Sequence, residues 1–459
     1  MAARSQALDL LLARLAEGSR SSAELEQALG RSQTWVNEAL RALMADGRVL
    51  RAGSRRGARY GLRREVVGAG SEWPLHRIDR AGEPRLLGTI RSISGDEYFI
   101  ESATDGPRLA TLSPGLPYFL QDQRPAGFLG RAVPRQYPDL DAPDRVQDWS
   151  DEHYLRYLTN HGSDTVGDLI LGRAAFDRYV AATQRPVRID AAARATEYPR
   201  LADEALRGGL AGSSPHGEHP KFAITLEDSG VPRPVLVKFS PPIGRPVGER
   251  WSDLLVAEHL ALETLRAAGI PAAASRIHRA GNRTFLEVDR FDRTTAGRVG
   301  VTSLLAIGTC LLGRIDPWIP ACAHLLRERR IAPEALEQIR FASAFGDLIG
   351  NTDKHAGNLA FFDGYDGHFS PAPVYDMLPM LHAPDHEELV AREFEPAPPS
   401  TETLGVWASA RTLAERYWRT LVSDERVSGS YRALAGECLA TLDSLPRTGP
   451  FAPAAGLPR

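Results

Sequence analysis

The chain has 459 residues, which is more than a single hydrophobic core usually serves, so its length predicts two or more domains. Its apolar fraction of 43% and charged fraction of 25% are ordinary for a folded protein. The sequence does not open with a basic-then-apolar leader, and no run approaches the roughly 18 apolar residues of a membrane span, so we expect a cytoplasmic protein without a membrane partner. Three cysteines without CxxC spacing support neither a disulfide framework nor a cysteine zinc site.

The net charge of −3 conceals an asymmetry along the chain. Residues 1–64 contain twelve Arg, no Lys and six Asp or Glu, a balance of +6, which leaves about −9 for the remainder. This basic segment indicates that the N-terminal part of the protein meets a polyanion.

Residues 1–64 predict three short helices followed by a two-stranded hairpin. A leucine-rich helix comes first, and Ser21 and Glu24, at capping-box spacing, open the second helix. Ser32 caps the third helix, and residues 48–62 fold back as a hairpin with an Arg- and Gly-rich tip. This order predicts a winged helix-turn-helix domain.

A winged helix predicts DNA binding, with the third helix in the major groove and the wing arginines on phosphates or in the minor groove. Protein docking is the alternative, and a homodimer is expected if the domain binds a palindrome. The candidate DNA-contacting residues are Gln33, Thr34 and Asn37 on the helix and Arg51, Arg55, Arg56 and Arg59 on the wing.

The rest of the chain divides into three regions, which together predict an α+β fold. Residues 65–150 are rich in Gly and Pro with short strand-like runs, which predicts a small, mostly β module. Residues 151–295 combine helical periods, a Gly- and Ser-rich loop and several strands, whereas residues 296–459 are mainly helical. The loop, residues 208–222, can turn its amides onto phosphates, but it lacks GxGxxG, and a plain flexible loop explains it equally well.

A lysine and a glutamate of residues 151–295 are expected to meet. Lys238 is the one cation of the strand-like run 235–240, where it either faces nucleotide phosphates or protects an edge strand. Glu258 lies in an apolar helical stripe, and an unpaired buried carboxylate there would cost on the order of several kcal/mol. Lys238 is therefore the predicted partner of Glu258.

The strongest motif is the run 351–358, which is followed by Asp376 after a strand-like segment. Asp353 and Asn358 have the Asp-x-x-x-x-Asn spacing of a protein-kinase catalytic loop, in which the Asp receives a hydroxyl proton and the Asn holds magnesium. Asp376 falls where a second magnesium ligand is expected. His355 is expected to brace the loop rather than to bind the metal, because magnesium prefers oxygen ligands. The set predicts phosphoryl transfer from a nucleotide, with a purely structural polar turn as the alternative.

Taken together, in their order along the chain, these motifs resemble those of the HipA family of bacterial serine/threonine kinase toxins over roughly residues 80–440. The added winged helix makes the chain most similar to the YjjJ branch of that family. The resemblance implies a HipA-like N-terminal β subdomain and a two-lobed, protein-kinase-like body with a helical C-terminal lobe. The segments that carry it are Leu116–Pro125, Ser213–Phe222, Val237–Phe239, Glu287–Arg293, Asn351–Asn358 and Val374–Asp376.

The resemblance also implies roles for individual residues. Asp353 corresponds to the catalytic base, Lys238 to the nucleotide-phosphate lysine, and Asn358 and Asp376 to magnesium ligands. Ser214 corresponds to the serine that family members phosphorylate in themselves, which ejects the loop and disables ATP binding. The residues expected to bind the nucleotide are Ser213, Ser214, Gly217, Lys221, Lys238, Asp289, Phe291 and His355.

The partners implied by the resemblance are a protein substrate and an antitoxin. Family substrates include aminoacyl-tRNA synthetases, so a component of translation is the expected substrate class. The typical toxin borrows a DNA-binding domain from its antitoxin, whereas residues 1–64 supply one here, which favours autorepression. Two departures from the family pattern bear on substrate choice. Gly357 stands where the best-known members carry a lysine, and residues 296–335 lack the family's usual glutamine- and acid-containing motif.

Two other functions fit the same residues. A transcriptional regulator with an inactive, nucleotide-sensing kinase body would bind ATP without transferring phosphate. A metal-dependent DNase would use the same oxygen ligands beside a DNA-binding domain.

Overall fold

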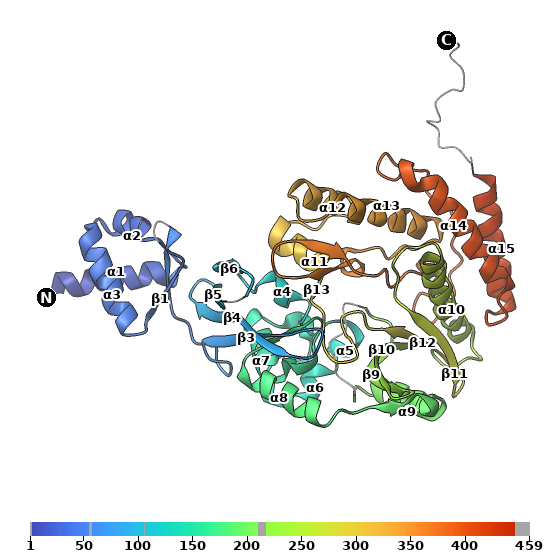
Figure 1. Cartoon of the computed structure of the whole chain (residues 1–459), viewed down its shortest axis with the longest axis horizontal. Helices are drawn as coiled ribbons and strands as arrows, with labels where there is room; N and C mark the ends of the chain where they lie inside the picture. The colour runs from blue at the N-terminus through green and yellow to red at the C-terminus, as the bar shows by residue number, and fades with distance from the viewer. Residues whose placement is uncertain (1, 55–56, 105, 210–216, 446–459) are drawn as a thin grey trace, which may run out of the picture.

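The computed structural model describes residues 2–54, 57–104, 106–209 and 217–445, and it has the predicted α+β fold (Figure 1). Four of the predicted site residues, Arg55, Arg56, Ser213 and Ser214, lie outside these ranges. Within the described ranges, no helix is long and apolar enough to cross a membrane.

The N-terminal module has three helices and a two-stranded antiparallel hairpin, in the predicted order. Ser21 and Glu24 form the expected capping box, and the Ser32 hydroxyl accepts a hydrogen bond from the Trp35 amide at 3.4 Å. Apolar side chains from all three helices make its small core. The elements are α1 (Ala2–Ala16), α2 (Ser22–Leu29), α3 (Gln33–Ala45), β1 (Val49–Ala52) and β2 (Arg59–Leu62).

The middle module, residues 65–184, is built on a five-stranded antiparallel sheet in the order β6-β5-β4-β3-β7. Its fifth strand lies beyond residue 150, the predicted end of the β module. The strands are β3 (Glu72–Ile78), β4 (Pro84–Ile93), β5 (Glu97–Ser102), β6 (Leu112–Pro114) and β7 (Leu169–Leu171), and the helices are α4 (Tyr118–Gln121), α5 (Gly127–Gly130), α6 (Val133–Gln136), α7 (Asp151–His161) and α8 (Arg173–Gln184).

The N-terminal module lies at one end of the molecule and packs on the turn between β4 and β5 (Figure 1). The Ser19 amide donates a hydrogen bond to the Glu97 carboxylate at 2.6 Å. Gly95 is so close to the N-terminal module that an added Cβ would lie 2.7 Å from the Gly18 Cα. A hydrogen bond and close backbone packing, as well as the covalent connection, therefore join the two modules.

A second five-stranded sheet, in the order β11-β12-β10-β9-β8, lies between α9 and α10. Because side chains alternate along a strand, Val237 and Phe239 pack toward α9 while Lys238 points to the α10 face. Lys221 pairs directly with Lys238 across the antiparallel strands and lies on the same face. The elements are β8 (Ile189–Asp190), α9 (Arg194–Leu206), β9 (Lys221–Asp228), β10 (Val231–Phe239), α10 (Pro246–Ala267), β11 (Ser275–Ala280) and β12 (Arg283–Asp289).

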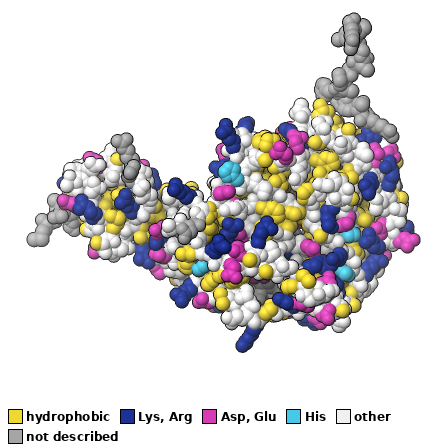
Figure 2. Space-filling view, in the orientation of Figure 1, with side chains coloured by type: hydrophobic (Ala, Val, Ile, Leu, Met, Phe, Trp, Pro, Cys, Tyr) yellow, Lys and Arg dark blue, Asp and Glu magenta, His cyan; other side chains and the backbone are white. Residues whose placement is uncertain are grey.

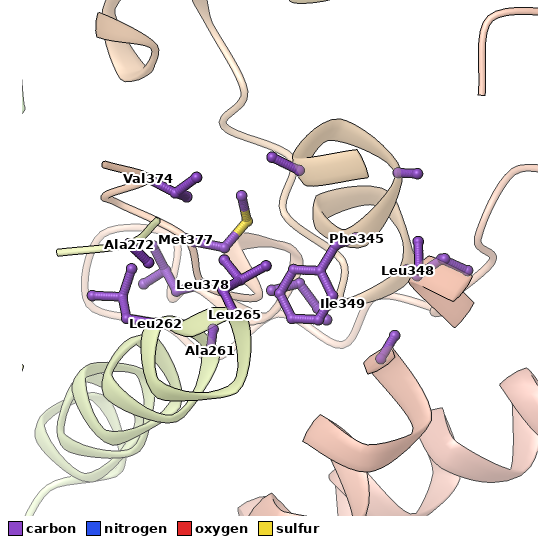
Figure 3. Packing of buried hydrophobic residues seen from close by; sticks show 14 of the residues in the cluster. Ala261, Leu262, Leu265, Ala272, Phe345, Leu348, Ile349, Val374, Met377 and Leu378 are labelled. Carbon is purple, nitrogen blue, oxygen red and sulfur yellow. The ribbon is translucent and has the colours of Figure 1, made fainter. Parts of the chain in front are cut away.

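The C-terminal region is a helical lobe with a small three-stranded sheet in the order β13-β14-β15. Leu262 and Leu265 of α10 belong, with Phe345, Ile349 and neighbouring apolar residues, to the largest core of the protein (Figure 3). Here the elements are β13 (Val301–Ser303), α11 (Leu304–Ile307), α12 (Trp318–Arg327), α13 (Pro333–Leu348), β14 (Ala360–Asp363), β15 (Phe369–Pro371), α14 (Leu404–Ser423) and α15 (Gly429–Ser444).

Candidate active site

A buried lysine held by two carboxylates forms the centre of the candidate site. The Lys238 Nζ donates hydrogen bonds to Glu258 Oε1 at 2.8 Å and Oε2 at 2.9 Å, and another to Asp376 Oδ1. Lys238 and Glu258 are 5% and 1% exposed, so both charges are removed from water. Burial lowers the pKa of Lys238, but Asp376 and Glu258 more than offset this effect, and the amine stays protonated.

A second buried lysine, Lys221, lies beside the first and is 2% exposed. Among the described residues its amine has no hydrogen-bonding or ion-pair partner. Burial lowers the pKa of Lys221 to about 8, against the attraction of Asp376. A buried cation without a partner is costly, so an anion bound beside Lys221 would be stabilised.

His219 lies next to the two lysines, in a cavity that both of them line. Its pKa falls to about 3 because of burial and because of the positive charges of Lys238 and Lys221, so the ring is neutral near pH 7. The Nε2 atom of His219 has no hydrogen-bond partner within the described ranges. Sequence reasoning missed this residue, although it lies in the Gly- and Ser-rich segment that was predicted to meet phosphates.

Two cavities meet at the lysines and share Lys221, Lys238, Glu258 and Asp376 as lining residues. The first cavity has mainly apolar walls, whereas the second, which we call the charged cavity, contains the carboxylate of Asp353 and the imidazole of His355. A flat apolar base and a chain of phosphates match these two environments. The walls of the first cavity include Leu236, Val288, Phe291, Val301, Ala360 and Tyr375.

Asp289 and Phe291, two of the residues expected to bind the nucleotide, both line the apolar cavity. The Asp289 amide donates to the Ala274 carbonyl at 2.8 Å and is used within the sheet. The Phe291 ring lies 5.6 Å from that of Tyr375, centroid to centroid, and in the described part of the chain its backbone amide and carbonyl make no hydrogen bond. Of the two backbone amides, that of Phe291 is therefore the one left to bind a base edge.

The catalytic-loop motif forms a braced turn around a half-exposed carboxylate. Asn351 Oδ1 accepts the Asp353 amide at 3.0 Å, and Asn358 Nδ2 donates to the Asp353 carbonyl at 2.9 Å. His355 Nδ1 accepts the Gly357 amide at 3.0 Å, so this histidine braces the loop. The Asp353 side chain is 50% exposed and lines the charged cavity, where it is accessible to a substrate hydroxyl.

Further hydrogen bonds hold this loop against the segment that carries Asp376. The Tyr375 hydroxyl donates to the Gly357 carbonyl at 2.7 Å, and Asn351 Nδ2 lies 3.4 Å from the Asp376 carbonyl. Lys354 Nζ donates to Asp347 Oδ1 at 2.5 Å and anchors the loop on α13. Sequence reasoning gave no role to Asn351, Lys354 or Tyr375, although all three lie within the motifs that it used.

Asn358 and Asp376 supply oxygen atoms of the kind that magnesium prefers. The Asn358 amide nitrogen donates its hydrogen bond to the loop backbone, which orients the side chain and leaves the Oδ1 oxygen for a cation. Lys238 and Lys221 more than offset the effect of burial and lower the pKa of Asp376, so this carboxylate is ionised. Within the described residues there is no group of three or more His, Cys, Asp or Glu that could hold a metal ion.

Of the predicted DNA-contacting residues, Gln33, Thr34 and Arg51 are exposed and Asn37 is partly exposed. Arg59 instead donates to the Ser19 hydroxyl at 3.0 Å and to its carbonyl at 2.6 Å, which ties the hairpin to the end of α1. On the face of the larger body drawn in Figure 2, basic and acidic side chains are interspersed.

Sequence comparison gives the family of the protein. The family model described as "YjjJ-like toxin, middle domain" matches residues 69–180, and the one described as "HipA-like C-terminal domain" matches residues 213–434. Toxin YjjJ of Escherichia coli (strain K12) is 35% identical over 437 residues, which cover 94% of this chain and 96% of that protein. The chain belongs to the YjjJ-like toxin family. Its C-terminal region is HipA-like, as the sequence motifs predicted.

Two solved structures are similar to this YjjJ-like protein at low identity. One is a complex of HipA, HipB and operator DNA from Shewanella oneidensis MR-1, with 13% identity, 81% of this chain and 95% of that chain covered, and a TM-score of 0.48. The other is the Helicobacter pylori proinflammatory kinase CtkA, with 13% identity, 48% and 90% covered, and a TM-score of 0.35.

Proposed function

We propose that this protein is a HipA-like, ATP- and magnesium-dependent serine/threonine protein kinase that acts as a toxin. The observation that carries the proposal is the buried Lys238–Glu258–Asp376 cluster, which borders the same cavity as the exposed Asp353 carboxylate. Membership of the YjjJ-like toxin family and the HipA-like C-terminal region support it. A component of translation remains the substrate class that we expect, and the cytoplasm its location.

In the proposed reaction, Asp353 accepts the proton of a serine or threonine hydroxyl as that oxygen bonds to the γ-phosphorus of ATP. The bond from the γ-phosphorus to the bridging oxygen breaks, and ADP leaves. Lys238 and Lys221 neutralise phosphate charge, while Glu258 fixes Lys238. Magnesium bound by Asn358 and Asp376 would neutralise further phosphate charge.

Residues 1–64 are proposed to form a winged-helix DNA-binding domain. Their three helices and hairpin, their balance of +6 and the exposure of Gln33, Thr34 and Arg51 support this assignment. Autophosphorylation at Ser214, which lies outside the described residues, remains our proposal for self-regulation, and a separate antitoxin or a homodimer remains a candidate partner.

The test of the proposed kinase activity is ADP formation from ATP by the full chain, with magnesium or with EDTA, for the wild type and for Asp353→Asn. The proposal expects magnesium-dependent turnover in the wild type alone. Turnover that survives Asp353→Asn would overturn the role of Asp353. Tight ATP binding without turnover would favour a nucleotide-sensing regulator, and ATP-independent nicking of plasmid DNA would favour a DNase.

A further inference from the structure

A turn of the middle module contacts the segment that leads into the lysine-bearing strand β9. The Phe128 amide donates a hydrogen bond to the Gly217 carbonyl at 3.0 Å. Gly127 lies so close to the same residue that an added Cβ would come within 2.4 Å of the Gly217 oxygen and 2.8 Å of its nitrogen. With φ at 58°, Gly127 also has a left-handed backbone, so both conformation and space require glycine.

The same turn contacts the strand that carries the other lysine. The Phe128 ring lies edge-on to the Phe239 ring, with centroids 6.4 Å apart, and Phe239 directly follows Lys238. The Phe239 amide donates to the Pro220 carbonyl at 3.1 Å, immediately before Lys221. The turn is therefore in contact with both strand ends that bring the lysines into the cleft.

Arg131 adds a charged contact at the end of this turn, because its guanidinium pairs with the Glu218 carboxylate. The two side chains are 49% and 68% exposed, so the ion pair contributes little stability by itself. Its effect is on geometry, since it holds the segment 217–221 from a second point. Both contacts come from the middle module, which lies outside the HipA-like region of residues 213–434.

We propose that residues 127–131 are a positioning element for the phosphates of a bound nucleoside di- or triphosphate. They hold residues 217–221 so that the unpartnered amine of Lys221 lies beside Lys238 in the cleft. The inference rests on the proposed function and extends it, because it assigns part of the phosphate-binding site to the middle module.

The base and the phosphates should respond differently to a change in this turn. Of residues 217–221, Lys221 alone lines the apolar cavity, whose apolar walls come from residues such as Phe291, Val301 and Tyr375. Displacing Gly217 would shift Lys221 and leave those walls in place. A merely structural role for the turn would instead weaken base and phosphate binding together.

The test is calorimetric titration of the full chain with magnesium-ATP and, separately, with adenosine. We expect Gly127→Ala to raise the Kd for ATP about tenfold, which corresponds to about 1.4 kcal/mol, and to leave the Kd for adenosine unchanged. Gly405→Ala is the matched control, because an added Cβ there meets nothing within 4 Å. In turnover assays the KM for ATP should rise while kcat changes little.

A second pair of variants keeps the inference testable if Gly127→Ala does not fold. Arg131→Gln should weaken ATP binding by a smaller factor, about threefold, and Arg131→Lys should restore it, since only the positive charge beside Glu218 is needed. Unchanged ATP affinity in folded Gly127→Ala, or in Arg131→Gln if the glycine variant is unfolded, would overturn the positioning role. A wild-type protein that does not bind ATP would instead refute the proposed function itself.

Discussion

The cleft and the N-terminal module both present cations, but in opposite surroundings. Lys238 and Lys221 are 5% and 2% exposed, and carboxylates fix the first of them, whereas Arg51 is exposed at the other end of the molecule. A buried charge carries stability as well as chemistry, because removing its partner leaves an unpaired ion away from water. An exposed charge contributes mainly to binding, and salt screens it. Substitutions that remove a buried charge from the cleft should therefore lower both stability and activity, whereas substitutions on the N-terminal module should mainly weaken binding.

The largest effect is expected for Lys238→Met, which leaves Glu258 buried without its cation. We expect phosphoryl transfer to be lost and the free energy of unfolding to fall by about 3–5 kcal/mol, measured by urea denaturation. The matched variant is the double substitution Lys238→Met with Glu258→Met, which removes both charges and should recover most of the stability but none of the activity. An undiminished stability of the single variant would contradict the buried ion pair.

Asp353→Asn should separate chemistry from stability in the same cleft. Because this side chain is half exposed, the free energy of unfolding should stay within about 0.5 kcal/mol of the wild type. Turnover should fall by about 10²- to 10⁴-fold, the usual contribution of a general base. Burial raises the pKa of Asp353, and the carboxylate of Asp376 adds to this, so activity should decline on acidification at a higher pH than an ordinary aspartate would cause.

Lys221 gives a pH-dependent signature that no exposed arginine can give. With its pKa lowered to about 8, the amine is charged below that pH and neutral above it. ATP affinity should therefore fall, by about tenfold, as the pH rises from about 7 to about 9. Lys221→Arg keeps its charge across this range and should show a flat profile. A wild-type profile as flat as that of the arginine variant would rule out Lys221 as a phosphate ligand.

The smallest effect is expected on the N-terminal module. Arg51→Ala should weaken DNA binding several-fold without changing ATP turnover and should reduce the slope of log K against log salt by about one. Arg145→Ala in the middle module, where the side chain is 75% exposed, is the control and should change neither property. Equal effects of the two variants would remove Arg51 from the DNA-binding surface.

Local signals in the sequence were sufficient to predict much of this fold. Ser21, Glu24 and Ser32 cap the predicted helices because capping depends on residues three positions apart. The contact between Lys238 and Glu258 was also predictable, since a carboxylate within an apolar stripe requires a partner and one lysine lay on the neighbouring strand.

Such local signals could not predict contacts between distant segments of the chain. Asp122 accepts hydrogen bonds from the amide and hydroxyl of Ser303, 181 residues away, both at 2.6 Å. Gly127 and Gly217 likewise meet only because the middle module packs against the second sheet. Neither contact is indicated by a spacing or periodicity in the sequence, so the contribution of the middle module to the site was found only in the structure.

Mass spectrometry of the full chain after incubation with magnesium and ATP tests the central claim most directly, with wild type and Asp353→Asn compared on the peptide that contains Ser213 and Ser214. The account predicts a phosphate on Ser214 in the wild type and none in the variant. No phosphate on any residue of a wild-type protein that binds ATP would contradict the assignment of this cleft as a protein-kinase active site.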